Sequence, residues 1–234
     1  MKNFFKLTLI LLTFYSFTIS SSKAWIADIW FIEDMDAQEL STATESFKEK
    51  ALAAGAKMKN IRSASKVRGD SPGNSTIVIA YYESYEDLMH DITLNSQKPD
   101  MFDSTYGQIN QDARSDNAIF SNNSPMPQGG GIGQTVTYAM VEITSGINFL
   151  LNMPKFQEKM QAAGAKVVVD SMGCAMCGQS VLPANGMIYF AAANPQDMGD
   201  AMDIFATDEM QRWVFANIAP HVNIIDGGMN IYNN

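Results

Sequence analysis

The sequence predicts an α+β fold built from two similar halves, and three observations support this prediction. First, residues 47–57 (FKEKALAAGAK) and 156–166 (FQEKMQAAGAK) are identical at eight of eleven positions. Second, a weaker similarity links 74–80 with 185–191 and continues to the end of the chain. Third, the strand and helix patterns follow one another in the same order in both halves of the chain. Repetition at a spacing of about one hundred residues indicates an internal duplication.

The first half reads strand, helix, strand, strand, helix, strand. An apolar run at 25–32 predicts the first strand. Leu40, Ala43 and Phe47 then fall on one face of a helix, which Gly55 ends. Further apolar runs predict the later strands, and Ser84 is a typical N-cap for the second helix. The predicted strands are 25–32, 57–64, 76–82 and 117–120, and the predicted helical pieces are 38–54, 85–94 and 99–109.

The second half repeats this order after a Gly- and Pro-rich linker over 121–134. Its predicted strands are 135–143, 166–171, 187–192 and 222–232, the last with a turn at 226–228, and its predicted helices are 147–163 and 196–217.

Each β-α-β-β-α-β unit is typical of a ferredoxin-like sandwich, in which two helices cover one face of a four-stranded sheet. The other face also needs a cover, because 77–79 and 188–190 are apolar throughout. A second copy of the unit is the natural cover. We therefore expect two ferredoxin-like βαββαβ repeats that form an eight-stranded α/β barrel in one chain, with helices outside.

With these features the chain resembles the dimeric α/β-barrel superfamily in its tandem-duplicated, single-chain form. The order-matched units and the paired AAGAK helix ends at 53–57 and 162–166 carry the resemblance. The resemblance implies a small apolar ligand between sheet and helices. The superfamily includes cofactor-free monooxygenases, isomerases and haem enzymes with an axial histidine. Neither His90 nor His221 stands in a motif that matches those haem enzymes.

The beginning of the chain predicts export. Lys2 and Lys6 precede an apolar run at 7–15, and small residues lead to Ala24, which is the pattern of a secretory signal peptide. The run is shorter than the roughly 20 residues that cross a bilayer, so no stable membrane insertion is expected after cleavage. The protein is therefore expected to be periplasmic or secreted. The predicted division is 1–24 signal peptide, 25–120 first repeat, 121–134 linker and 135–234 second repeat.

The charge balance disfavours nucleic acid as a partner. The chain has 16 Lys and Arg against 25 Asp and Glu, a formal net charge of −9. Removing the three lysines of the signal segment leaves 13 against 25, or −12. Such a surface repels phosphate backbones. A small apolar molecule is the expected partner.

The only two cysteines, Cys174 and Cys177, form a C-x-x-C pattern predicted to lie in the loop between the second and third strands of the second half. Three interpretations stay open. An exported protein favours a local disulfide. A redox dithiol is the second. With Met172 and Met176 beside them, the thiolates would also suit Cu(I). Apart from copper, no cofactor is expected.

Polar groups among the apolar residues of the first strand of each half suggest a catalytic pocket. Asp28 and Trp30 share one face of the first strand by alternation, and Tyr138, Met140 and Glu142 share a face of the matching strand. If both faces point into the cavity, Asp28, Tyr138 and Glu142 converge as acid or base, while Trp30 and Met140 bind the ligand.

Three functions follow, and the sequence does not decide whether the protein is an enzyme. The first is an exported small-molecule-binding protein with an apolar pocket. The second is a cofactor-independent monooxygenase or isomerase, with Arg62 as the nearest counter-charge to the acids. The third is a periplasmic copper-binding or thiol-redox protein that uses Cys174 and Cys177. Because only the second half carries cysteines, the site is expected in or beside that half.

Overall fold

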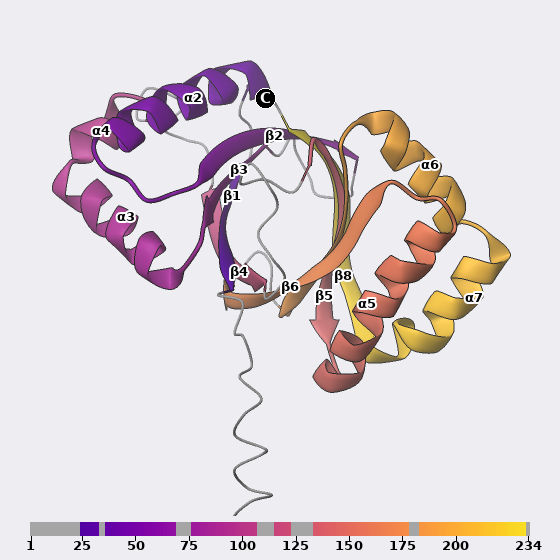
Figure 1. Ribbon diagram of the computed structural model, residues 1–234. Helices are drawn as coiled ribbons and strands as arrows, with labels where there is room; N and C mark the ends of the chain where they lie inside the picture. Colours follow the sequence, from indigo (N-terminus) through magenta and orange to yellow (C-terminus); the bar gives the residue numbers. More distant parts are fainter. Residues whose placement is uncertain are drawn as a thin grey trace, which may run out of the picture.

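Eight antiparallel strands form a closed barrel with helices on its outside (Figure 1). The computed structural model describes residues 24–32, 36–68, 76–106, 115–122, 133–177 and 183–232. The strand order is β1-β3-β2-β8-β5-β7-β6-β4, and β4 pairs with β1 to close the ring. The strands are β1 (Trp25–Ile32), β2 (Asn60–Arg68), β3 (Thr76–Tyr82), β4 (Ser115–Asn122), β5 (Thr135–Ile143), β6 (Val167–Cys177), β7 (Gly186–Ala192) and β8 (Val222–Tyr232).

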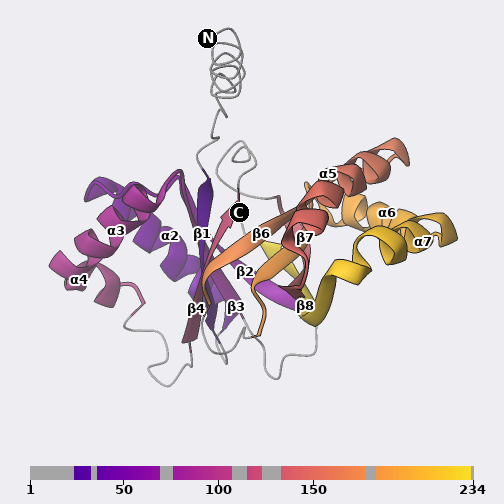
Figure 2. The same ribbon diagram turned by 90° about the horizontal axis from the view of Figure 1, so that it is seen from below.

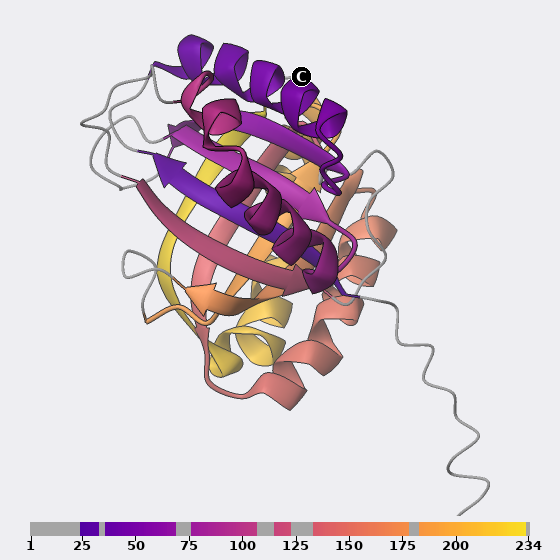
Figure 3. The same ribbon diagram turned by 90° about the vertical axis from the view of Figure 1, so that its left-hand side faces the viewer.

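The helices form two layers, one on each side of the barrel (Figure 2). Helices α2, α3 and α4 cover the sheet of the first half, and Figure 3 shows α2 and α3 lying across its strands. Helices α5, α6 and α7 cover the sheet of the second half. The helices are α2 (Ala37–Ala53), α3 (Tyr85–Gln97), α4 (Pro99–Asp103), α5 (Gly146–Ala162), α6 (Pro195–Phe205) and α7 (Asp208–Asn217), followed by the 3-10 turn η2 (Ala219–His221). The predicted α+β class is confirmed.

The two halves have the same internal strand order. The first half runs β4-β1-β3-β2 and the second runs β8-β5-β7-β6, so each places its first and third strands in the middle. The halves meet at two seams, where β2 pairs with β8 and β4 pairs with β6. Each seam therefore joins the second strand of one half to the last strand of the other.

The repeated AAGAK segments end α2 and α5 in the same way. Gly55 and Gly164 have φ angles of 97° and 95°, which glycine adopts without a steric penalty. The following amides of Ala56 and Ala165 donate to carbonyls five residues earlier, at 2.9 and 3.0 Å. This is the Schellman motif. The sequence repeat thus corresponds to a repeated local structure.

Three apolar clusters stabilise the fold. One contains residues from all eight strands, including Trp25, Phe120, Tyr138 and Tyr189, and fills the barrel interior. A second lies between the sheet of the first half and its helices, and a third lies in the same place in the second half. Each strand therefore has one face toward the barrel and one toward a helix layer.

The structure corrects three predicted elements. The predicted helix over 196–217 is two helices, because Thr207 accepts a hydrogen bond from the Met210 amide and starts α7 anew. The predicted turn at 226–228 lies within a continuous β8, whose pairing with β5 shifts register beside Asp226. The predicted loop that holds the cysteines is part of strand β6. The predicted signal peptide and most of the predicted linker lie outside the described residues.

Candidate functional site

A buried polar cluster lies on the outer face of the first half, where α3 packs on the sheet. Asp28 on β1 is 9% exposed and shares its face with Ile26 of the sheet–helix core. Asp91 on α3 is 4% exposed. Burial raises the pKa of Tyr82 well above its ordinary value, and the negative charges of Asp91 and Asp28 raise it further. The Tyr82 phenol therefore stays protonated and remains a hydrogen-bond donor beside two carboxylates.

Trp30 lies at the edge of this cluster. Its indole Nε1 donates a hydrogen bond of 3.2 Å to Asp28 Oδ2. Unlike Asp28, Trp30 is 39% exposed, so it reaches from the buried carboxylate to the surface. The structure thus brings the predicted acid and the predicted ligand-binding tryptophan together on the first strand.

Asp91 holds a histidine in place. Its two carboxylate oxygens accept hydrogen bonds from the backbone amides of Lys57 and Met58, at 2.7 and 3.0 Å, just after the end of α2. His90 Nδ1 lies 3.0 Å from Asp91 Oδ1. An ionised carboxylate can only accept, so Nδ1 is the donor to it, and Nε2 is an acceptor when the ring is neutral. A histidine oriented in this way by an acid is suited to act as a general base.

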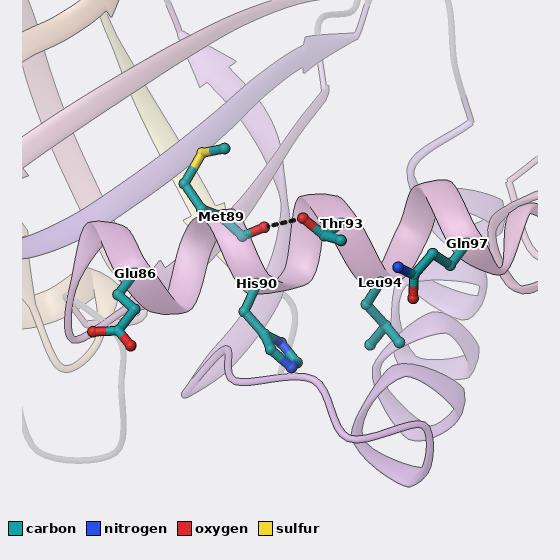
Figure 4. A pocket seen from close by; sticks show the side chains of 6 residues that line it. All are labelled: Glu86, Met89, His90, Thr93, Leu94 and Gln97. Atoms are coloured by element: carbon teal, nitrogen blue, oxygen red, sulfur yellow. Dashed lines mark hydrogen bonds between the residues drawn. The ribbon is translucent and has the colours of Figure 1, made fainter.

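A pocket of about 500 Å³ runs along α3 and includes His90 (Figure 4). Figure 4 shows Glu86, His90 and Leu94 extending from the same side of the helix. Two of the lining residues, Met89 and Leu94, are apolar, and the other four carry polar groups. The six lining residues are Glu86, Met89, His90, Thr93, Leu94 and Gln97.

The second half lacks this cluster. Ser84 and Asn194 cap α3 and α6 identically, each accepting the amide three residues later, and this aligns Asp91 with the buried Ala201. Because the same fold forms in the second half without these polar groups, the fold does not require them. This candidate site lies in the first half, whereas the cysteines suggested a site in or beside the second, and that suggestion stays a prediction. The other correspondences are Asp28 with Thr137, Tyr82 with Ala192, and His90 with Asp200.

The predicted convergence of Asp28 with Tyr138 and Glu142 does not occur. Tyr138 and Met140 point into the barrel, whereas Asp28 points toward the helices. The inward-facing positions of β1 are its odd-numbered residues, and those of β5 are its even-numbered ones. Glu142 lies at the end of β5, where Asn223 Nδ2 donates to its Oε2 at 3.0 Å. The catalytic roles of Tyr138 and Glu142 stay predictions.

Arg62, the expected counter-charge, also lies on the barrel side of its strand. Its Nη1 donates to the carbonyl of Gly133 at 2.6 Å, and its guanidinium carbon is 4.8 Å from the ring centroid of Tyr232. Burial raises the pKa of Tyr232 to about 12, although the Arg62 charge opposes the shift. Arg62 therefore interacts with an aromatic ring and a carbonyl, on the opposite face of the sheet from Asp28.

The predicted soft-metal group is split between two environments. Cys174 lies on β6 and packs against the barrel interior, as does Met172, which is 1% exposed. Met176 is 55% exposed. The two methionines therefore do not gather around one point. The side chain of Cys177 lies outside the described part of the chain, so the disulfide stays a prediction.

Sequence reasoning missed Tyr82 and Asp91 and assigned no role to His90. One signal could have found Asp91. It lies three residues after the buried Leu88, so it falls on the apolar face of α3, where a charged residue is unusual. Aligning the two halves would have placed Ala201 opposite it.

No family model matches the sequence, and no curated protein matches it. Solved structures do share the fold. A putative monooxygenase from Fusobacterium nucleatum subsp. nucleatum ATCC 25586 has a TM-score of 0.57 and 10% identity, covering 90% of this chain and 94% of its own. A putative monooxygenase from Lactobacillus acidophilus NCFM has a TM-score of 0.53 and 13% identity, covering 90% and 95%. An anthrone oxidase-like protein has a TM-score of 0.51 and 12% identity, covering 92% and 94%.

The comparisons also correct the prediction of no cofactor other than copper. A putative chlorite dismutase has a TM-score of 0.50 and 7% identity, covering 91% of this chain and 96% of its own. A heme-binding protein from Thermus thermophilus has a TM-score of 0.47 and 10% identity, covering 90% and 92%. The expectation of no cofactor other than copper is therefore withdrawn.

The described residues do not fit a heme between sheet and helices. In the second half that space is filled by aromatic rings, with the centroid of Phe156 5.7 Å from that of Phe190 and 5.9 Å from that of Trp213. In the first half it holds the polar cluster and a buried apolar core. Within the described ranges, no three His, Cys, Asp or Glu side chains gather to hold a metal ion. Heme has no part in the function proposed below.

None of the helices in the described segments is long and apolar enough to span a membrane.

Proposed function

We propose that this protein binds a small, largely apolar molecule in the α3 pocket and removes a proton from it with His90. The pairing of His90 with the buried Asp91 at the pocket wall carries this proposal. Asp91 would orient the ring and stabilise the imidazolium that forms. Asp28 stays the second candidate for an acid or base, since its charge and that of Asp91 both act on the Tyr82 phenol.

For the reaction we propose monooxygenation, the cofactor-independent alternative that the sequence suggested. Its support is the shared fold with two putative monooxygenases and an anthrone oxidase-like protein. A base would remove one proton from an activated CH₂ group of the substrate, and the resulting carbanion would pass its electrons to O₂. One oxygen atom would remain on carbon as a carbonyl, and the other would leave as water. The balance is CH₂ + O₂ giving C=O + H₂O.

The test is oxygen consumption with an anthrone in aerobic buffer, which needs no added reductant. His90→Gln keeps a polar side chain but removes the base, and we expect the rate to fall by about 100-fold or more. His221→Gln, which changes the other histidine, should leave the rate unchanged. Full activity of the His90→Gln variant would exclude this base.

The binding function can be separated from the enzymatic one. If the wild-type protein retains an anthrone in equilibrium dialysis but consumes no oxygen, the protein is a binding protein and His90 is not a catalytic base. In that case Leu94→Glu, which places a charge in the pocket, should still weaken binding. The exposed Leu52→Glu, on α2, is the matched control.

We also propose that the protein is exported and that its halves arose by tandem duplication. The basic, apolar and small-residue pattern of residues 1–24 supports export. The repeated AAGAK segments and the equal strand orders support duplication. Export predicts a periplasmic or secreted form whose intact mass lacks residues 1–24. An unprocessed protein in the cytoplasmic fraction would contradict it.

A further inference from the structure

The second half exposes a group of large apolar side chains that its core does not use. Ile147 is 78% exposed, Ile224 73%, Phe215 68%, and Leu150 and Leu151 61% each. They are the most exposed large hydrophobic residues among those described. We name these five residues the uncharged corner. Monomeric proteins seldom present so many large apolar groups together without a partner.

The five residues come from three elements that meet at one end of the second helix layer. Asn152 on α5 donates to the carbonyl of Asn217 at the end of α7, at 2.9 Å. Next to this contact, the amide of Thr144 donates to the carbonyl of His221 at 2.9 Å, just before β8 begins. Figure 1 shows the beginning of α5, the end of α7 and the start of β8 at the same end of this layer. The five side chains therefore belong to one region.

The chain segments that carry the five side chains contain no charged residue, and two charged groups that hydrogen-bond to them, Glu142 to Asn223 and Lys155 to Asn152, are of opposite sign. Residues 143–154 and 213–225 contain no Lys, Arg, Asp or Glu, although 18% of the whole chain is charged. The net charge of the chain is −9. Two copies of so acidic a protein repel each other, and the repulsion is smallest where the contact surfaces are uncharged.

We propose that a second copy of this chain docks on the uncharged corner, so that the same patch meets itself across a two-fold axis. Such an isologous contact needs a self-complementary surface, and an uncharged apolar patch is one. Five mostly exposed large side chains offer several hundred Å², on the order of the roughly 800 Å² that each partner contributes to a standard interface. An anionic membrane fits less well, because interfacial helices place Lys and Arg beside their apolar face.

The dimer would leave the α3 pocket free, since the corner and the pocket lie on opposite halves. The proposal does not depend on the proposed function, and neither one's failure affects the other.

The test is sedimentation equilibrium of the full mature chain over a wide concentration range. The wild type should dimerise, and Leu151→Glu should raise the dissociation constant by at least about 100-fold, because it places a like charge at the centre of the contact. Leu52→Glu, an exposed leucine on α2 that is 47% accessible, should dimerise as the wild type does. Both variants should keep the wild-type circular dichroism spectrum.

Three results would overturn the proposal. One is a wild type that stays monomeric at every concentration, and another is an equal effect of the two variants. The third is a monomer that co-sediments with vesicles of mixed neutral and anionic lipid through Leu151, which would assign the corner to a membrane.

Discussion

Asp91 is the residue on which the candidate site depends. It accepts two backbone hydrogen bonds after α2 and contacts His90, while its own helix packs on the sheet. The Asp91 side chain thus binds the backbone that follows α2, holds α3 against it, and orients a histidine that lines the pocket. The second half, with Ala201 there, packs the same layer with an apolar contact.

We predict that Asp91→Asn lowers both stability and activity. An asparagine can accept with only one of its two polar atoms, so one buried amide loses its partner. The free energy of unfolding should fall by about 2 kcal/mol in urea denaturation. The rate of anthrone oxidation should fall as it does for His90→Gln. Asp203→Asn, a change at an exposed position on α6, serves as the control, and an equal loss there would contradict the role of Asp91.

At the scale of the element, the glycine before β5 has a steric role that most of the other described glycines lack. Gly133 has a φ of 109°, and a Cβ there would lie 2.6 Å from the carbonyl oxygen of Ala192 on β7. Its own carbonyl accepts the hydrogen bond from Arg62. The chain therefore enters the second half through a position that only glycine suits.

Gly133→Ala should lower the free energy of unfolding by at least about 1 kcal/mol, because the positive φ and the clash both oppose a Cβ. Gly199 is the matched position, since it lies within α6 and a Cβ added there would meet open space. Gly199→Ala should raise stability by about 0.5 to 1 kcal/mol, as expected in a helix. Thermal or urea unfolding of the two variants measures both signs, and a stable Gly133→Ala would contradict the geometry.

At the scale of the whole molecule, the barrel interior and the helix interfaces bury several tyrosines. Burial raises the pKa of Tyr106 and Tyr232 to about 12, and that of Tyr138 and Tyr189 further still. In the unfolded chain a tyrosine loses its proton near pH 10. Above that pH the unfolded state holds fewer protons than the folded state.

Stability should therefore be unaffected by these groups below about pH 10 and should fall as the pH rises through about 12. Urea unfolding at several pH values, together with tyrosinate absorbance, measures this. Tyrosinate absorbance of nearly all tyrosines near pH 10, with the circular dichroism spectrum unchanged, would contradict the burial of these phenols.

The closure of the barrel depends on two seams between the halves. A separate half would expose β2 and β4, or β6 and β8, as unpaired edges, and such edges tend to associate. We predict that fragments 25–120 and 134–234, expressed separately, form a complex when mixed. Size-exclusion chromatography of the mixture tests this, and two fragments that elute separately would contradict it.

The sequence by itself determined the local features: the repeated helix ends, the order of strands and helices, and the α+β class. These depend on residues close together in the chain, such as Gly55 in its left-handed conformation. Alternation also showed that Asp28 and Trp30 share a face, but it could not show which face. Asp28 corresponds to Thr137 and not to Tyr138 in the second half. An error of one residue in matching two strands reverses the face on which every side chain is placed.

Only the tertiary structure decided which groups meet. Asp91 reaches amides more than thirty residues away, and Tyr82 faces carboxylates from a strand and a helix. The tertiary structure also separated the two methionines beside the cysteines, since Met172 is buried and Met176 is exposed. Contacts between distant segments arise from how the sheets and helix layers pack, and no local pattern encodes that packing. The candidate site in the first half is therefore a property of the folded chain.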